Sequence, residues 1–218
     1  MVFDKNDNAL APLAGKTAEV VGITSVTDAV AKATTAQRRT LIIVGHGEPG
    51  TIGMGAGESA GYTQGKDLKF DKLIDVRSQL QTLSERYAPA PVENPTENSN
   101  LLVLCGCKSG DGENGAALVR NLSNIFRNTY VVASNVSTSV GSWQRSMICA
   151  WQVSSGNPTR WTTRASTIGF NGGIVNGRET MTAVINLVNN RACVQCDTPA
   201  QCKTAALSLK VRVQGCGG

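Results

Sequence analysis

Residues 41–47 read Leu-Ile-Ile-Val-Gly-His-Gly, and residues 101–107 read Leu-Leu-Val-Leu-Cys-Gly-Cys. In each segment a run of apolar residues ends at a glycine beside a reactive side chain. Such runs are typical of strands that are buried on both faces of a parallel sheet. If the two strands belong to one sheet, the imidazole of His46 and the thiol of Cys107 project from the same edge. The pair therefore predicts both a sheet and a cysteine nucleophile with a proton carrier.

Strand and helix patterns alternate along the rest of the chain. Strands are expected at residues 18–23, 40–45, 101–105 and 130–133, and helices at residues 27–34, 70–87, 118–126 and 181–188. Residues 147–153 and 160–168 favour two more strands, paired antiparallel at the end of the sheet. Proline residues between 88 and 99 indicate an exposed, cleavable loop. The alternation predicts an α/β fold with a mainly parallel sheet flanked by helices.

The length and the cysteines indicate how the chain is organised. With 218 residues, the chain is long enough for one domain with a buried core. We expect an α/β domain over residues 1–190 and a small cysteine-rich C-terminal extension over residues 191–218. The extension holds four cysteines, namely Cys193, Cys196, Cys202 and Cys216. Their spacing is compatible with two disulfides, with one zinc ion or with free thiols.

Composition bears on partners and location. The net charge is +5, but the basic residues are scattered and no aromatic residues lie between them, so we expect no nucleic-acid partner. No segment approaches the ~20 apolar residues of a membrane span, and no membrane partner is expected. The polar start lacks the apolar core of a signal peptide, which favours the cytoplasm or an export route without one. A small polyanion such as an inositol phosphate would suit the positive charge as an activator, although no basic cluster points to it.

The chemical motifs favour a thiol site without a cofactor. The glycines at 53, 55 and 57 do not open a helix, and no phosphate-binding loop with Gly-Lys-Ser/Thr is present. We therefore expect no cofactor, and no metal at the reactive site. Of the two cysteines that end the second strand, Cys105 is expected to point to the opposite face or into the core as a structural thiol. Cys107 is followed by a polar, glycine-rich loop, and it is the natural unpaired thiol of an odd set of seven cysteines.

The order of these motifs resembles the caspase-like (clan CD) cysteine peptidases, in which one apolar block ends in His-Gly and a second ends in a small residue plus Cys. Residues 106–110, Gly-Cys-Lys-Ser-Gly, are similar to the Gly-Cys-x-Ser-Gly of separase. The run of three strands also resembles the autoprocessing cysteine protease domains of bacterial toxins. Residues 46–50, His-Gly-Glu-Pro-Gly, are similar to a motif of an uncharacterised caspase-like domain in large bacterial surface proteins. The resemblance covers roughly residues 18–143.

The resemblance implies a fold, a reaction and roles for residues. The fold would be a caspase-like three-layer sandwich, and the substrate a polypeptide, with self-processing as one form of the activity. Cys107 would attack the scissile carbonyl as a thiolate, and His46 would protonate the leaving amine. The backbone N–H groups of Gly47 and Cys107 would hold the oxyanion.

The resemblance also implies where the substrate side chain binds. The segment after the third core strand would line that pocket, with Ser134, Asn135 and Trp143 as its candidate residues. No acidic residue lies between Val131 and Trp161, so Asp111 and Glu113 are the fallback carboxylates for a basic substrate side chain, and the preference of the pocket stays open. Two other functions share the same motifs. One is a catalytically silent caspase-like domain that binds or scaffolds, and the other is a non-peptidase acyl hydrolase or transferase that uses the same dyad.

Overall fold

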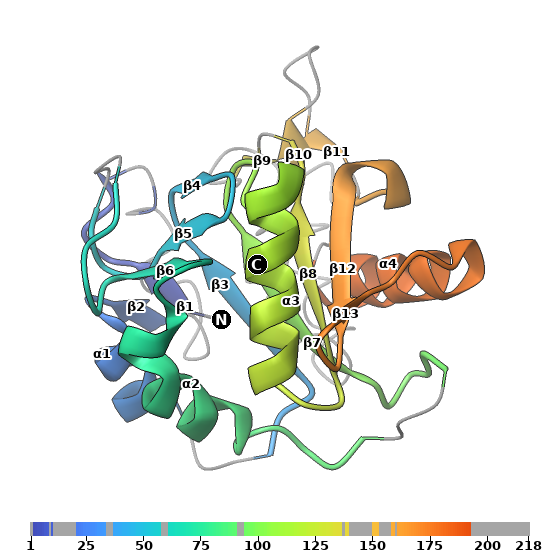
Figure 1. The fold of residues 1–218 in the computed structure, drawn as a ribbon, viewed down its shortest axis with the longest axis horizontal. Coiled ribbons are helices and arrows are strands. Elements are labelled where there is room, and N and C mark those ends of the chain that lie inside the picture. Colours follow the sequence, from blue (N-terminus) through green and yellow to red (C-terminus); the bar gives the residue numbers. More distant parts are fainter. Residues whose placement is uncertain are drawn as a thin grey trace, which may run out of the picture.

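A seven-stranded sheet forms the centre of the molecule (Figure 1). The computed structural model describes residues 2–8, 10, 21–33, 37–57, 61–90, 94–136, 138–139, 150–152, 158–159 and 161–192. In spatial order the strands of the sheet are β13 (Gly173–Ile174), β12 (Ser166–Phe170), β8 (Thr129–Ser134), β7 (Asn100–Cys105), β3 (Thr40–Val44), β1 (Val2–Asp4) and β2 (Val21–Ile23). The five strands from β8 to β2 run parallel, whereas β12 is antiparallel to β8 and β13 is antiparallel to β12.

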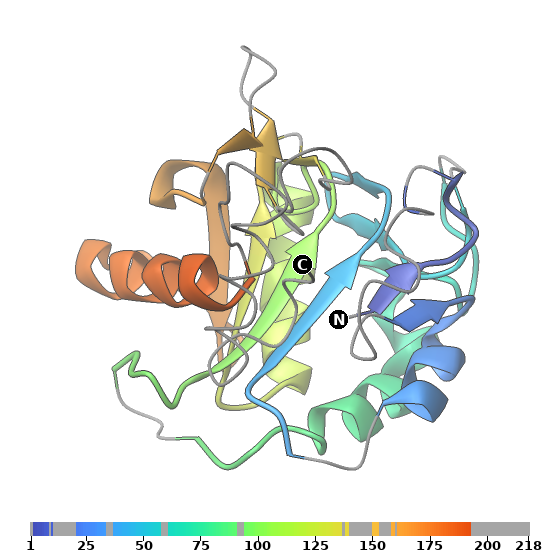
Figure 2. The ribbon, with the colours of Figure 1, turned by 180° about the vertical axis from the view of Figure 1, so that it is seen from behind.

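Helices cover both faces of this sheet. One face carries α1 (Val26–Lys32), the 3-10 helix η2 (Leu73–Val76), α2 (Arg77–Ser84) and α3 (Gly112–Ile125). The other face carries α4 (Arg178–Ala192), which Figure 2 shows in front of the sheet. The fold is therefore α/β, with a mainly parallel sheet between helical layers, as the alternating pattern predicts.

The continuous apolar runs in the central strands follow from the helices that cover both faces of the sheet. In β3, Leu41 and Ile43 join the cluster that includes the α3 side chains, whereas Ile42 and Val44 join the cluster that includes the α4 side chains. All four side chains are at most 2% exposed. Successive side chains of a strand point to opposite faces, so a strand covered on both faces needs apolar residues at every position.

Two small antiparallel sheets lie outside the central one. The first contains β4 (Gly47–Glu48), β5 (Thr51–Gly53) and β6 (Asp67–Lys69), and it begins directly after His46. The second contains β9 (Thr138–Ser139), β10 (Ala150–Gln152) and β11 (Pro158–Thr159). The expected antiparallel pairing of residues 147–153 with 160–168 is wrong. The strand β10 pairs with β9 and β11, whereas β12 pairs with β8, because periodicity marks a strand without choosing its partner.

Two other elements differ from expectation. The helical pattern at 70–87 gives a shorter helix, since η2 supplies its first turn and α2 ends at Ser84. The strand β1 was not expected, because only Val2 and Phe3 give it an apolar pattern before Asp4. It nevertheless pairs with both β2 and β3, so the polar start of the chain forms part of the sheet. The cysteine-rich extension from Cys193 onward lies outside the described residues.

The amino-terminal edge of the sheet is closed by side-chain hydrogen bonds. The hydroxyl of buried Tyr87 donates to the carbonyl of Leu101 at 2.8 Å. The guanidinium of Arg39 donates to the carbonyls of Pro89 and Asn98. Arg191, at the end of α4, donates to the carbonyl of Ser99 at 2.6 Å. The predicted cleavable loop between 88 and 99 is thus held at both ends.

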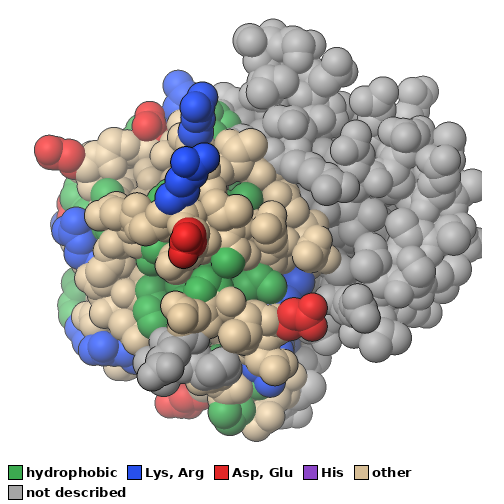
Figure 3. All heavy atoms as spheres, turned by 90° about the vertical axis from the view of Figure 1, so that its right-hand side faces the viewer, with side chains coloured by type: hydrophobic (Ala, Val, Ile, Leu, Met, Phe, Trp, Pro, Cys, Tyr) green, Lys and Arg blue, Asp and Glu red, His purple; other side chains and the backbone are tan. Residues whose placement is uncertain are grey.

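The surface agrees with the scattered charge of the sequence. Figure 3 shows basic and acidic side chains interspersed on the face that contains α4. Among the described helices, none is long and apolar enough to cross a membrane.

Candidate active site

The register of β3 and β7 brings the two predicted reactive residues to one edge. Val44 pairs with Cys105 in this parallel ladder, and His46 and Cys107 each lie two positions further along. The N–H of Gly45 donates to the carbonyl of Cys105 at 3.3 Å, which extends the pairing beyond the strands. Both residues therefore lie at the carboxyl ends of neighbouring strands, where ligands of open α/β sheets bind.

Gly47 lets the two loops touch. A β-carbon on this residue would lie 2.6 Å from the carbonyl carbon of Gly106 and 2.7 Å from the backbone nitrogen and oxygen of Cys107. No side chain fits at such distances, because the neighbouring atoms belong to the backbone. The sequence suggests that glycines around His46 leave room for a ligand. In the structure, this glycine makes room for the loop that carries Cys107.

A tight turn presents Cys107. The hydroxyl and the N–H of buried Ser109 both donate to the carbonyl of Gly106, at 3.1 and 3.3 Å. Gly110 donates to the carbonyl of Ser134 at 2.8 Å, and a β-carbon on it would lie 2.9 Å from Ala133. The serine and the last glycine of Gly-Cys-x-Ser-Gly therefore fix the turn against the end of β8. Cys107 is half-buried at the start of this turn.

The two cysteines at the end of β7 differ chemically. Cys105 is buried on the α4 face and is disulfide-bonded. Cys107 carries a thiol. The buried position of Cys105 agrees with a structural role, but the expectation that it is a thiol is wrong because it is disulfide-bonded. A disulfide sulfur is not a thiolate nucleophile, so Cys107 stays the predicted nucleophile of the two.

His46 has an acidic neighbour that the sequence did not reveal. Its Nδ1 lies 3.4 Å from Oδ2 of Asp7, which follows β1. The imidazole is 58% exposed, whereas the carboxylate is only 2% exposed. Asp7 reaches the histidine because β1 is the neighbour of β3 in the sheet. The signal for it is the short run Val2-Phe3 followed by acidic residues, which is too brief to predict a strand.

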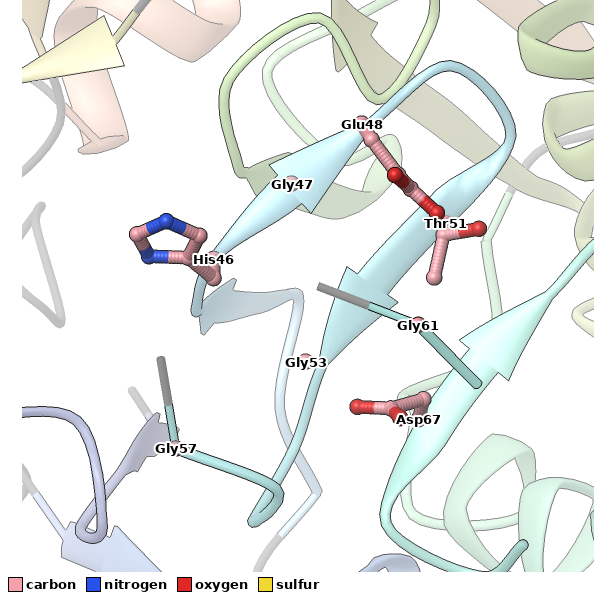
Figure 4. A pocket seen from close by; sticks show the side chains of 8 residues that line it. All are labelled: His46, Gly47, Glu48, Thr51, Gly53, Gly57, Gly61 and Asp67. Carbon is pink, nitrogen blue, oxygen red and sulfur yellow. The ribbon is translucent and has the colours of Figure 1, made fainter. Parts of the chain in front are cut away.

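A pocket of about 230 Å³ opens beside the histidine (Figure 4). Its lining consists of His46, Gly47, Glu48, Thr51, Gly53, Gly57, Gly61 and Asp67. Asp67 comes from β6 and is 3% exposed, whereas Glu48 is exposed at the end of β4. Burial raises the pKa of the Asp67 carboxyl, and the charges of Asp4 and Glu48 raise it further, against a lowering effect of the Thr63 N–H.

The residues predicted for the substrate pocket lie on another side of Cys107. The hydroxyl of buried Ser134 donates to the carbonyl of Val136 at 2.8 Å, and Asn135 accepts a hydrogen bond from Thr167. Asp111 precedes the first turn of α3. Trp143 lies outside the described residues. None of the three described residues lines the pocket of Figure 4, so a β8-side pocket stays a prediction.

Comparison with known proteins gives one match. A family model described as "Domain of unknown function (DUF4347)" matches residues 5–158, which include Asp7, His46 and Cys107. No curated protein matches the chain. Within the described residues, no group of three or more histidine, cysteine or acidic side chains is arranged to hold a metal ion.

Proposed function

The chain belongs to the DUF4347 family, a domain of unknown function, and we propose that it is a cysteine endopeptidase with a Cys107–His46 dyad. One observation carries the proposal. The paired ends of β3 and β7 place the only histidine of the sequence and a thiol at equal offsets on one sheet edge, with Gly47 against the backbone of Cys107. A thiol and an imidazole so placed are suited to nucleophilic catalysis on an acyl group.

The reaction follows from these groups. The Cys107 thiolate attacks the carbonyl carbon of a peptide bond, and the electron pair of the C=O bond moves to the oxygen. The N–H groups of Gly47 and Cys107 stabilise that oxyanion. When the intermediate collapses, the C–N bond breaks and His46 gives its proton to the leaving amine. Water, with His46 as its base, then hydrolyses the thioester and restores the thiol.

Asp7 supports the histidine in this scheme. A carboxylate near Nδ1 favours the orientation in which Nε2 faces the substrate, and it stabilises the protonated imidazole. At 3.4 Å from Nδ1, and with the ring 58% exposed, Asp7 acts as a positioning residue rather than as a group that touches the substrate. The buried position of its carboxylate keeps it fixed while the imidazole moves.

The finer assignment is to the caspase-like superfamily. It is supported by the order of the His-Gly and Gly-Cys motifs and by the mainly parallel sheet between helical layers. The proposed substrate is a polypeptide. Because the chain resembles the autoprocessing domains of toxins, a peptide bond within the same chain is one candidate target.

The test uses the full chain and a mixed peptide library, with cleavage followed by mass spectrometry. The wild-type chain is expected to cut peptides, and Cys107→Ala and His46→Ala are expected to reduce cleavage to background while the thermal unfolding midpoint stays within the wild-type range. Thr82→Ala, on α2 and outside the site, removes a hydroxyl that donates to the carbonyl of Ser78 and is the control that keeps full activity. Cleavage by Cys107→Ala would overturn the proposal. So would a wild-type chain that cuts no peptide, and hydrolysis of thioesters alone would point to an acyl hydrolase.

A further inference from the structure

We infer that the pocket beside His46 binds the cationic side chain of a lysine or arginine that lies next to the scissile bond. The inference rests on the proposed peptidase function and adds the class of substrate. His46 belongs to both the dyad and the pocket wall, whereas the carboxylates of the pocket come from β4 and β6.

The pocket has an acidic lining. Among the described residues that line it, Glu48 and Asp67 are acidic and none is a lysine or an arginine. A third carboxylate lies just behind, since a β-carbon on Gly53 would be 3.3 Å from Oδ2 of Asp4 and 3.6 Å from Oδ1 of Asp67. The exposed side chain of Lys66 opposes the effect of these charges on the pKa of Asp67. A positive group in this pocket would be attracted by all three carboxylates.

Asp67 has one oxygen without a protein donor. Its Oδ2 accepts the N–H of Thr63 at 2.6 Å, whereas no described residue donates to Oδ1. Asp4 differs, because its Oδ1 accepts from the N–H of Asn6 and its Oδ2 accepts from the N–H of Gly57, both at 2.9 Å. Figure 4 shows the Asp67 side chain extending into the pocket. The side chain is 3% exposed, and its Oδ1 can accept a hydrogen bond from a donor that enters the pocket.

The dimensions fit a long side chain. The 230 Å³ of the pocket has room for about seven non-hydrogen atoms, since a water molecule occupies about 30 Å³. Gly53, Gly57 and Gly61 contribute no side chain to its walls, which leaves backbone surface for an unbranched alkyl stem. The stem would meet backbone and the Thr51 side chain, and the charged end would meet Asp67.

The position of the pocket sets which residue of the substrate enters it. His46 and Gly47 form one wall, and Gly47 is also the residue in contact with the backbone of Cys107. A side chain in the pocket therefore belongs to a residue adjacent to the attacked carbonyl. A metal ion is the other cation that carboxylates attract, but within the described chain no three ligands are arranged to hold one. Ammonium and guanidinium groups need only hydrogen-bond acceptors, and Asp67 offers one.

Two measurements separate this inference from the proposed function. The first is binding of N-acetyl-argininamide and of its neutral analogue N-acetyl-citrullinamide to the Cys107→Ala chain, which needs no catalysis. The second is kcat/KM of the wild-type chain for peptides that differ only by lysine against norleucine or arginine against citrulline. Both are repeated with Asp67→Asn, which can still accept the Thr63 N–H, and with Glu48→Gln, whose exposed side chain is not needed for folding. Asp71→Asn removes the same charge from an exposed site outside the pocket and serves as the control.

The cationic ligand and peptides are expected to be preferred by about 10- to 100-fold, the range of one charge-assisted hydrogen bond. Asp67→Asn should abolish most of this preference, Glu48→Gln should reduce it, and Asp71→Asn should leave it intact. Equal binding and equal cleavage of charged and neutral partners would overturn the inference while leaving the peptidase proposal in place. Preferential binding without any peptide cleavage would uphold a cation pocket and overturn the peptidase proposal.

Discussion

The two edges of the central sheet are built in opposite ways. At the amino-terminal edge, Tyr87, Arg39 and Arg191 direct their polar groups to carbonyl oxygens of the same chain. At the carboxyl-terminal edge, the imidazole of His46 is exposed, Cys107 carries a thiol, and among the described residues one oxygen of Asp67 has no donor. The three amino-terminal side chains bond within the fold, whereas His46 and Asp67 line a pocket.

Mutations at the two edges should therefore have different consequences, on activity at one edge and on stability at the other. A hydrogen bond within the fold contributes to the free energy of unfolding, whereas a group kept for a ligand contributes little to it or opposes it. The predictions below test this division, starting with the largest expected effect.

Gly47→Ala should damage the carboxyl-terminal edge most. Its β-carbon would overlap the backbone of Gly106 and Cys107, so we expect a loss of about 1–3 kcal/mol in the free energy of unfolding. The displacement of the dyad should lower kcat/KM by about 100-fold. Urea denaturation and peptide cleavage measure the two effects. Gly177→Ala is the control, since its β-carbon would lie 3.7 Å from Thr180, and an equal effect of both variants would contradict the predicted overlap.

Asp7→Asn should weaken catalysis without disturbing substrate binding. The loss of the carboxylate beside Nδ1 removes its support of the protonated imidazole, and we expect kcat to fall about tenfold, or about 1.4 kcal/mol, with KM unchanged. Steady-state kinetics across pH 5 to 9 provide the measurement. A rise in KM with constant kcat would show that Asp7 contacts the substrate instead.

Tyr87→Phe should have the reverse profile at the amino-terminal edge. The variant removes the hydroxyl that donates to Leu101 and keeps the ring packing, including the edge contact with Phe126. The free energy of unfolding is expected to fall by about 1 kcal/mol. Peptide cleavage should be unchanged, and any loss of activity beyond the loss of folded protein would show that the two edges are coupled.

Asp67 should give the smallest effect on stability, with a distinctive pH dependence. Burial raises the pKa of its carboxyl in the folded chain above the ordinary 3.8 of the unfolded chain. At a pH between the unfolded-state pKa and the folded-state pKa, the folded chain therefore binds more protons than the unfolded chain. Stability attributable to Asp67 therefore falls as the pH rises through this window. Asp67→Asn should unfold at a higher temperature than the wild type at pH 7, and the difference should shrink toward pH 4. A difference that is independent of pH would contradict this account.

The sequence was most informative where apolar runs are long. The runs that end at His46 and Cys107 predict buried parallel strands, and both strands are confirmed as neighbours. The strand β1 was not predicted because it has only three residues. A strand that short is stabilised by pairing with its neighbours and shows no periodicity of its own. Asp7 was missed with it. The pocket was missed because its residues come from three small strands and the loops between them.

The α/β class and the two buried strands that end before His46 and Cys107 could be predicted from the sequence, and both are confirmed. They follow from local periodicity, which needs no knowledge of distant partners. The three-dimensional fold was needed to show which strands pair, that Asp7 lies beside His46, and that Asp67 and Glu48 share a pocket with it. Such groupings join residues far apart in the chain, and they are set by strand pairing and packing that no local pattern records.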